Sequence, residues 1–183
     1  MRAFGLSRAL SGPKTQPNIR NPAIRRGFVE LRWSHTIRSL TMTPLFSDAD
    51  IERIALGVIE RTLPKPEWTH AAHFAAAFWV LRRPGMNAEA DMPKLIRAYN
   101  LSTGVANTDS SGYHETITLA SLRAARAWLK GRPETPLHTA LDELLASRYG
   151  RSDWLLEYWS KPVLFSVMAR RAWIDPDLKP FPF

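Results

Sequence analysis

The chain has 183 residues, enough for one domain with its own core, and its 45% apolar residues and seven tryptophans are typical of a folded protein. It has no cysteine, which excludes a disulfide framework, a zinc ribbon and thiol catalysis. The net charge is +8, but residues 1–41 hold eight basic residues against one acid, a net +7 that leaves +1 for residues 42–183. The domain itself therefore lacks a basic footprint, and we expect no nucleic-acid partner.

Residues 1–41 form a basic extension that is rich in arginine and serine and is interrupted by prolines, so we expect disorder up to about Gly27. Three interpretations stay open. The extension is a mitochondrial-type transit peptide, a basic arm for a membrane surface or nucleic acid, or a product of start-codon choice with Met42 as the usual start. We expect a cytoplasmic protein, or mitochondrial-type targeting if the extension is a transit peptide.

The first two helices of the domain have clear boundaries in the sequence. Ser47 is predicted to cap a helix that carries acids in its first turn and ends before Pro64. Thr69 is predicted to cap a second helix, which stops at Pro84. The apolar run 74–81 within it is eight residues long, far short of the ~20 that a membrane span needs.

Asn87 is predicted to cap a third helix, with Pro93 near its first turn. A polar insert, residues 107–116, then precedes a fourth helix that runs to Leu129 and is closed by Gly131.

Three further helices are predicted in the C-terminal part. Thr135-Pro136 is expected to cap the first, Ser152-Asp153 to start a short aromatic helix, and Ser160 to start a last helix through Met168. No run alternates with the period of a strand. The sequence thus predicts an all-α fold, a single helical-bundle-like domain of about six or seven helices over residues 42–183.

Two groups near the C-terminus are predicted to be structural. The aromatic residues of this region are expected to pack in the core. The four charged residues are expected to form a solvated face, with an ion-pair set as the alternative. The aromatic group is Trp154, Tyr158, Trp159 and Trp173, and the charged group is Glu157, Arg170, Arg171 and Asp175.

Two polar inserts, residues 68–73 and 107–116, hold three of the five histidines. Neither forms a phosphate-binding loop, a dinucleotide fingerprint, a zincin motif or a nucleophile elbow. If the second, third and fourth helices run up, down and up, the starts of the second and fourth lie at the same end of the bundle. We therefore expect His70, His73, His114 and Glu115 to converge there with the loop 107–111.

The first functional hypothesis is a metal centre with His70, His73 and His114 as ligands and Glu115 or Asp109 completing the set. Imidazoles three residues apart on a helix can reach one ion, and they suit a divalent transition metal such as zinc, iron or nickel. With an open position the metal would activate water, giving a small hydrolase-like enzyme. Glu115 and Asp109 are the catalytic candidates.

Two alternatives remain beside the metal. The site is a metal-free binding or catalytic site for a small anionic or polar molecule, since helix starts offer N–H groups and partial positive charge, or it is a structural polar network. Glu115 and Asp109 decide between the first two, because carboxylates that face the pocket favour a metal and carboxylates that face away favour an anion. The predicted substrate-binding residues are Asn107, Thr108, Tyr113 and Thr116.

The inserts carry W-T-H-x-x-H and N-T-D-x-x-G-Y-H-E-T patterns, which, together with Leu63-Pro64, Tyr99-Asn100 and residues 173–178, resemble a family of uncharacterised bacterial proteins. The resemblance covers most of residues 42–182 and implies no activity. It implies that Met42 lies near the usual start. Metal-binding bundles of the DinB-like kind are similar only in using helix-borne histidines, and their spacing differs.

Overall fold

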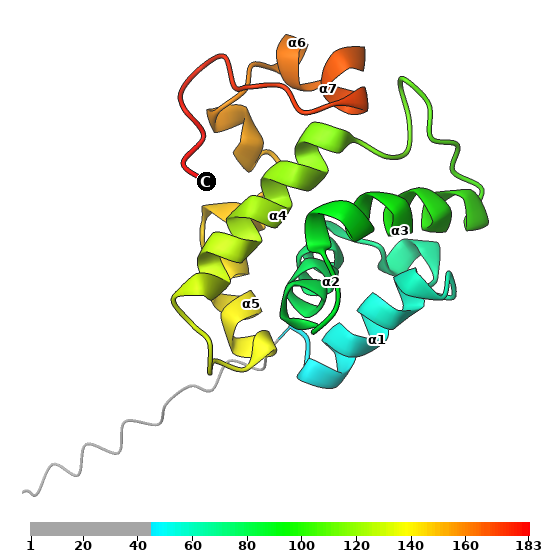
Figure 1. Cartoon of the computed structure of the whole chain (residues 1–183), viewed down its shortest axis with the longest axis vertical. Coiled ribbons are helices and arrows are strands. Elements are labelled where there is room, and N and C mark those ends of the chain that lie inside the picture. The colour runs from blue at the N-terminus through cyan, green and yellow to red at the C-terminus, as the bar shows by residue number, and fades with distance from the viewer. Residues whose placement is uncertain (1–44) are drawn as a thin grey trace, which may run out of the picture. The chain divides into compact units, whose positions relative to one another are not determined.

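Helix α2 (His70–Arg82) lies at the centre of the domain in the computed structural model, which describes residues 45–183 (Figure 1). The predictions for residues 1–41 fall outside these described residues. The other α-helices are α1 (Asp48–Ile59), α3 (Ala88–Ser102), α4 (Glu115–Lys130), α5 (Leu137–Ala146), α6 (Lys161–Leu164) and α7 (Val167–Arg171). Three 3-10 turns are η1 (Lys65–Glu67), η2 (Arg148–Gly150) and η3 (Trp154–Glu157). Residues 45–183 contain seven α-helices and no strand, so the all-α prediction is confirmed.

Side-chain caps set the starts of the first three helices where the sequence predicts them. Ser47 and Asp50 form a reciprocal capping box, with the Ser47 hydroxyl accepting from Asp50 N at 3.1 Å. Thr69 Oγ1 accepts from Ala72 N at 3.2 Å, and Asn87 caps α3 in the same way. These local hydrogen bonds satisfy backbone donors that a helix start otherwise leaves free.

The C-terminal helices differ from the prediction in three places. Helix α5 begins after Pro136, which provides no side-chain cap, rather than after Thr135. The aromatic segment after Asp153 is a 3-10 turn instead of an α-helix. The last predicted helix is split into α6 and α7, because the Ser166 hydroxyl accepts from Ala169 N at 3.1 Å and so caps a new helix.

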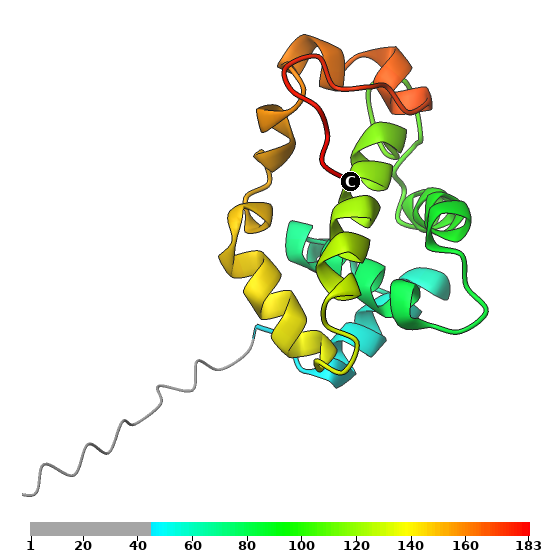
Figure 2. The same ribbon diagram turned by 60° about the vertical axis from the view of Figure 1, so that its left-hand side comes forward.

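Helix α2 crosses α4 instead of running alongside it (Figure 2). The predicted parallel arrangement of these two helices is therefore wrong. A helix that is apolar on all sides is buried on all sides, and residues 74–80 of α2 are all buried. The small side chains of its alanines leave room for α1, α4 and α5 to pack around it.

The C-terminal segment folds back over the aromatic residues of η3. Trp154, Tyr158 and Trp159 are buried, as predicted, and Phe181 packs on Trp159 with ring centroids 5.1 Å apart. The four charged residues do not form the alternative ion-pair set, because its members take other partners. Glu157 pairs with Arg148 and Lys179, Arg171 pairs with Asp109, and Asp175 accepts from Trp173 Nε1. Within residues 45–183, no helix is long and apolar enough to cross a membrane.

Close packing around α2 gives a stability test. Ala75 is completely buried, so Ala75→Leu should force its neighbours apart and lower the free energy of unfolding by about 1–3 kcal/mol. The matched control is Ala127→Leu on the exposed face of α4, which should change it by less than about 0.5 kcal/mol. Urea denaturation measures both, and equal effects would contradict this packing.

Candidate functional site

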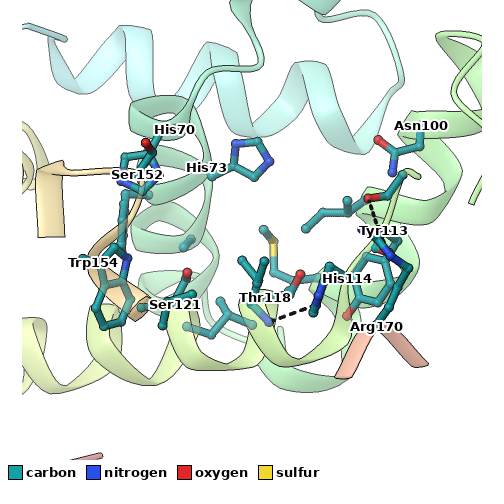
Figure 3. A pocket seen from close by; sticks show the side chains of 18 of the residues that line it. His70, His73, Asn100, Tyr113, His114, Thr118, Ser121, Ser152, Trp154 and Arg170 are labelled. Atoms are coloured by element: carbon teal, nitrogen blue, oxygen red, sulfur yellow. Dashed lines mark hydrogen bonds between the residues drawn. The ribbon is translucent and has the colours of Figure 1, made fainter. Parts of the chain in front are cut away.

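A cavity of about 400 Å³ lies between α2, α3, α4 and the C-terminal part of the chain (Figure 3). Its volume falls in the range of small-molecule sites. It brings His70, His73, His114 and Tyr113 to one place, although α2 and α4 cross. Its apolar wall includes Phe74, Met92, Ile96, Ile117, Leu122, Trp154 and Leu155, and its other polar side chains are Asn100, Thr118, Ser121, Ser152 and Arg170.

Backbone carbonyls fix the tautomers of the two α2 histidines. His70 Nε2 lies 2.8 Å from Tyr149 O, and His73 Nδ1 lies 2.6 Å from Thr69 O. A carbonyl only accepts, so these nitrogens carry the protons, which leaves His70 Nδ1 and His73 Nε2 as acceptors. The His73 ring stacks on Trp68, with centroids 3.8 Å apart, and projects into the cavity (Figure 3).

His114 uses both of its ring nitrogens in the fold. Its Nδ1 accepts from Ile117 N at 3.4 Å and thereby caps α4. Its Nε2 donates to Leu164 O at 2.9 Å, which ties the start of α4 to α6. His114 therefore has no free lone pair to offer to a metal ion.

Burial favours the neutral form of two of these histidines, His73 and His114. Burial lowers the pKa of His73 to about 4, although its hydrogen bond to Thr69 O favours the charged form. Burial also lowers the pKa of His114, and the positive charge of Arg170 acts in the same direction.

The two predicted catalytic carboxylates face away from the cavity. Glu115 Oε2 lies 3.3 Å from Arg97 Nη2. Asp109 forms a bidentate ion pair with Arg171, whose Nε and Nη2 donate to the two carboxylate oxygens at 2.8 and 2.7 Å. Neither lines the cavity. Among residues 45–183, no group of three or more histidine, cysteine, aspartate or glutamate side chains is arranged to hold a metal ion.

The predicted metal centre is thus not assembled in the structure. His114 is occupied by capping α4, and the carboxylates of Glu115 and Asp109 are held by arginines on the outer side. Sequence spacing placed these residues near one another, but it did not show which partners would compete for them.

The loop before α4 is held by its own side chains. Asn107 Oδ1 accepts from Asn100 Nδ2 at 2.9 Å and from Tyr113 N at 3.0 Å, and Thr108 Oγ1 accepts from two amides of the turn. Thr116 Oγ1 donates to Ala172 O at 2.8 Å and fastens the segment after α7 to α4. Of the four predicted substrate-binding residues, Tyr113 lines the cavity and the other three stabilise its frame.

Gly112 sets the direction in which the chain enters α4. Its φ is +75°, in the left-handed region that side chains disfavour. A Cβ there would lie 2.5 Å from Ala106 O and 2.8 Å from Asn107 Oδ1. The loop therefore closes tightly only around glycine, and this closure places Tyr113 and His114 at the cavity.

Arg170 is the residue that the sequence placed elsewhere. Instead of projecting from a solvated face or joining an ion-pair set, its Nη1 donates to Gly112 O at 3.3 Å and to Tyr113 O at 3.0 Å. Its Nε and the Tyr113 hydroxyl are buried and have no hydrogen-bond partner within residues 45–183. Nothing in the sequence links Arg170 to the insert at residues 107–116, because the contact depends on how α7 packs.

Three polar residues of α4 and α3 were also missed. Thr118 and Ser121 line the cavity with His114, and their spacing of four and seven residues from it is the signal that could have identified them. Asn100 lines the cavity from α3, and no helical spacing relates it to the predicted site residues on α2 and α4.

No protein-family model, curated protein or solved structure matches the chain. The resemblance of the two inserts to a bacterial family therefore stays a prediction, and any functional proposal rests on the chemistry of the cavity itself.

The tightness of the loop at Gly112 can be tested by comparison with Gly104, which has the same φ but open space where a Cβ would lie. Gly104 also has φ +75°, and a Cβ there would meet nothing within 4 Å. Gly104→Ala should cost only the left-handed strain of ~1 kcal/mol, and Gly112→Ala about 1–3 kcal/mol more because of the close contacts. Equal losses in chemical denaturation would show that the loop relaxes freely.

The low pKa of His73 predicts a pH dependence of stability. Between the unfolded pKa near 6.5 and the folded pKa of about 4, the unfolded chain binds a proton that the folded chain does not. Stability should therefore fall as pH drops from 6.5 to 4, by at most about 3 kcal/mol from this group.

His73→Leu removes the titrating ring and should flatten this part of the stability–pH profile. Denaturation midpoints at half-unit pH steps would show the difference between wild type and variant. Parallel profiles would mean that His73 titrates normally.

Proposed function

We propose that the protein binds a small, mostly apolar molecule with a polar group in the cavity between α2, α3 and α4, without a metal ion. The observation that carries the proposal is the cavity lining: a largely apolar wall with a few converging polar groups, three of them histidines, and no aspartate or glutamate among the described residues that line it. Concave apolar sites with a few placed polar groups are typical of small-molecule binding.

The polar groups of the cavity are positioned to orient such a molecule. His73 Nε2 is an acceptor whose tautomer is fixed by Thr69 O. The hydroxyls of Thr118 and Ser121 can donate or accept on the α4 side, and Asn100 lies on the α3 side (Figure 3). Fixed rotamers and tautomers reduce the entropy lost on binding, so they favour a ligand whose polar group matches these positions over a purely apolar molecule.

Binding is favoured here over metal-dependent hydrolysis, the first hypothesis from the sequence. Hydrolysis at a metal needs an open coordination position and a base for the water. The free lone pairs on the three histidines are His70 Nδ1 and His73 Nε2, and both candidate bases, Glu115 and Asp109, are already paired with arginines.

Thermal unfolding with a metabolite library, in the presence and absence of EDTA, tests this function. A ligand at 100 times its Kd stabilises the fold by about 2.7 kcal/mol, which raises Tm by roughly 5–10 °C. The rise should survive chelation. Elemental analysis of untagged protein should find no stoichiometric metal.

Two tryptophan substitutions on α4 separate cavity binding from surface binding. Ser121→Trp fills the cavity and should abolish the ligand-induced rise in Tm, whereas Ala127→Trp on the exposed face should keep it. Stoichiometric zinc, iron or nickel, with stabilisation lost in EDTA, would instead restore the metal hypothesis.

A further inference from the structure

We infer that the polar group of the ligand is an anion, specifically the carboxylate of an aliphatic or aromatic monocarboxylate, and that Arg170 binds it. This inference rests on the proposed function, because it names the class of molecule that the same cavity takes. It goes beyond that function in assigning the charge of the ligand, its orientation and the residue that selects it.

The charge of the cavity is the first argument. Arg170 is the one arginine or lysine among the lining residues of the described chain, and no aspartate or glutamate lines the cavity. Burial lowers the pKa of the lining His73 and His114, so neither ring adds a positive charge at neutral pH. The two acids near the loop are already used, Glu115 by Arg97 and Asp109 by Arg171. In the part of the chain that the structure describes, Arg170 bonds only to backbone carbonyls.

The orientation of the guanidinium is the second argument. Two carbonyls, Gly112 O and Tyr113 O, hold its Nη1, so the planar group cannot turn freely. Its Nε is buried and makes no hydrogen bond within residues 45–183. A buried donor without an acceptor is costly, and a carboxylate oxygen is the acceptor that guanidinium N–H groups bind best.

The Tyr113 hydroxyl is a second buried donor in the same wall. Tyr113 is 3% exposed, and its oxygen has no partner among the described residues. Burial raises the pKa of Tyr113, and the nearby Glu115 carboxylate acts in the same direction, so the phenol keeps its proton. The side chains of Glu115 and Thr118 lie near the hydroxyl, but neither is in hydrogen-bond geometry with it. Two unpaired donors in one wall favour a group that only accepts.

The rest of the cavity fixes the orientation of the ligand. Arg170 and Tyr113 lie at one end, and Trp154 and Ser152 lie at the other (Figure 3). His73 Nε2, between them, is an acceptor and would repel a carboxylate. The carboxylate should therefore sit at the Arg170 end, with the apolar body extending along Phe74 toward Trp154.

One arginine and an apolar wall select a singly charged head. A phosphate monoester or a dicarboxylate would place a second negative charge against apolar side chains, which costs free energy unless it is paired. The cavity of about 400 Å³ also limits the body to metabolite size.

Titration calorimetry with matched probes tests the inference. The probes are 3-phenylpropionate and octanoate, their neutral amides, and phenyl phosphate. Wild-type protein should bind each carboxylate about tenfold or more tightly than its amide, as expected for a charge-assisted hydrogen bond. It should bind phenyl phosphate more weakly than 3-phenylpropionate.

Arg170→Gln should remove the preference for carboxylate over amide, and Arg170→Lys should keep part of it. The matched control is Arg126→Gln on the exposed face of α4, which deletes a positive charge paired with Glu89 outside the cavity and should leave the preference intact. Circular dichroism and Tm check that each variant folds. If Arg170→Gln does not fold, Tyr113→Phe carries the test, because it deletes one hydroxyl and should reduce the preference several-fold.

The outcomes separate this inference from the proposed function. Amides that bind as tightly as carboxylates, or a preference that persists in Arg170→Gln, would overturn the role of Arg170 while leaving the cavity as a binding site. Tighter binding of phenyl phosphate would overturn the assignment to carboxylates. If neither carboxylate binds, the monocarboxylate class is wrong, and the proposed function itself fails only if no library compound stabilises the protein in EDTA.

Discussion

The two hydrogen bonds of His114 are the constraint on which the cavity depends. Through Nδ1 the ring caps the start of α4, and through Nε2 it holds the carbonyl at the end of α6. One side chain thus joins a long central helix to a C-terminal segment 50 residues further along the chain. Two further hydrogen bonds reinforce the same junction. Arg170 on α7 donates to Tyr113 O just before α4, and Thr116 on α4 donates to Ala172 O just after α7. The cavity wall is formed where these segments meet.

This junction explains why the histidines of the two inserts do not form a metal centre in the structure. A helix start leaves backbone N–H groups that need acceptors, and a histidine in the first turn can satisfy one of them at once. A ring that caps with one nitrogen and donates with the other has no lone pair left. Hydrogen bonds to carbonyls make the three histidines part of the frame, and they leave His70 Nδ1 and His73 Nε2 as the ring acceptors that remain free.

Local signals in the sequence predicted most of the fold. Caps such as Ser47, Thr69 and Asn87 act within three residues, so their effect can be recognised from the sequence alone. The split between α6 and α7 was missed because a serine such as Ser166 can either lie within a continuous helix or cap a new one. The crossing of α2 and α4 was missed because short connections suggest neighbours but do not fix the angle between them.

The site was predictable only as a location. The inserts at residues 68–73 and 107–116 do reach one cavity, as their polar character suggested. The partners of their charged groups could not be predicted, because Arg97 and Arg171 reach Glu115 and Asp109 through tertiary packing. Arg170 was misplaced for the same reason. These contacts join residues 18 to 62 positions apart, and contacts at such separations leave no periodic pattern in a single sequence.

The distribution of ion pairs gives the cavity its chemical preference. Arg97 and Arg171 neutralise the two acids closest to the loop, and they do so on its outer side. Had either acid turned inward, it would have paired with Arg170 and cancelled the charge that faces the cavity. Outward pairing instead leaves one oriented guanidinium beside an apolar wall, a combination that lowers the stability of the chain alone. A ligand that supplies the missing acceptor removes that cost, so the unpaired donors that weaken the fold are the source of the selectivity for an anion that we propose.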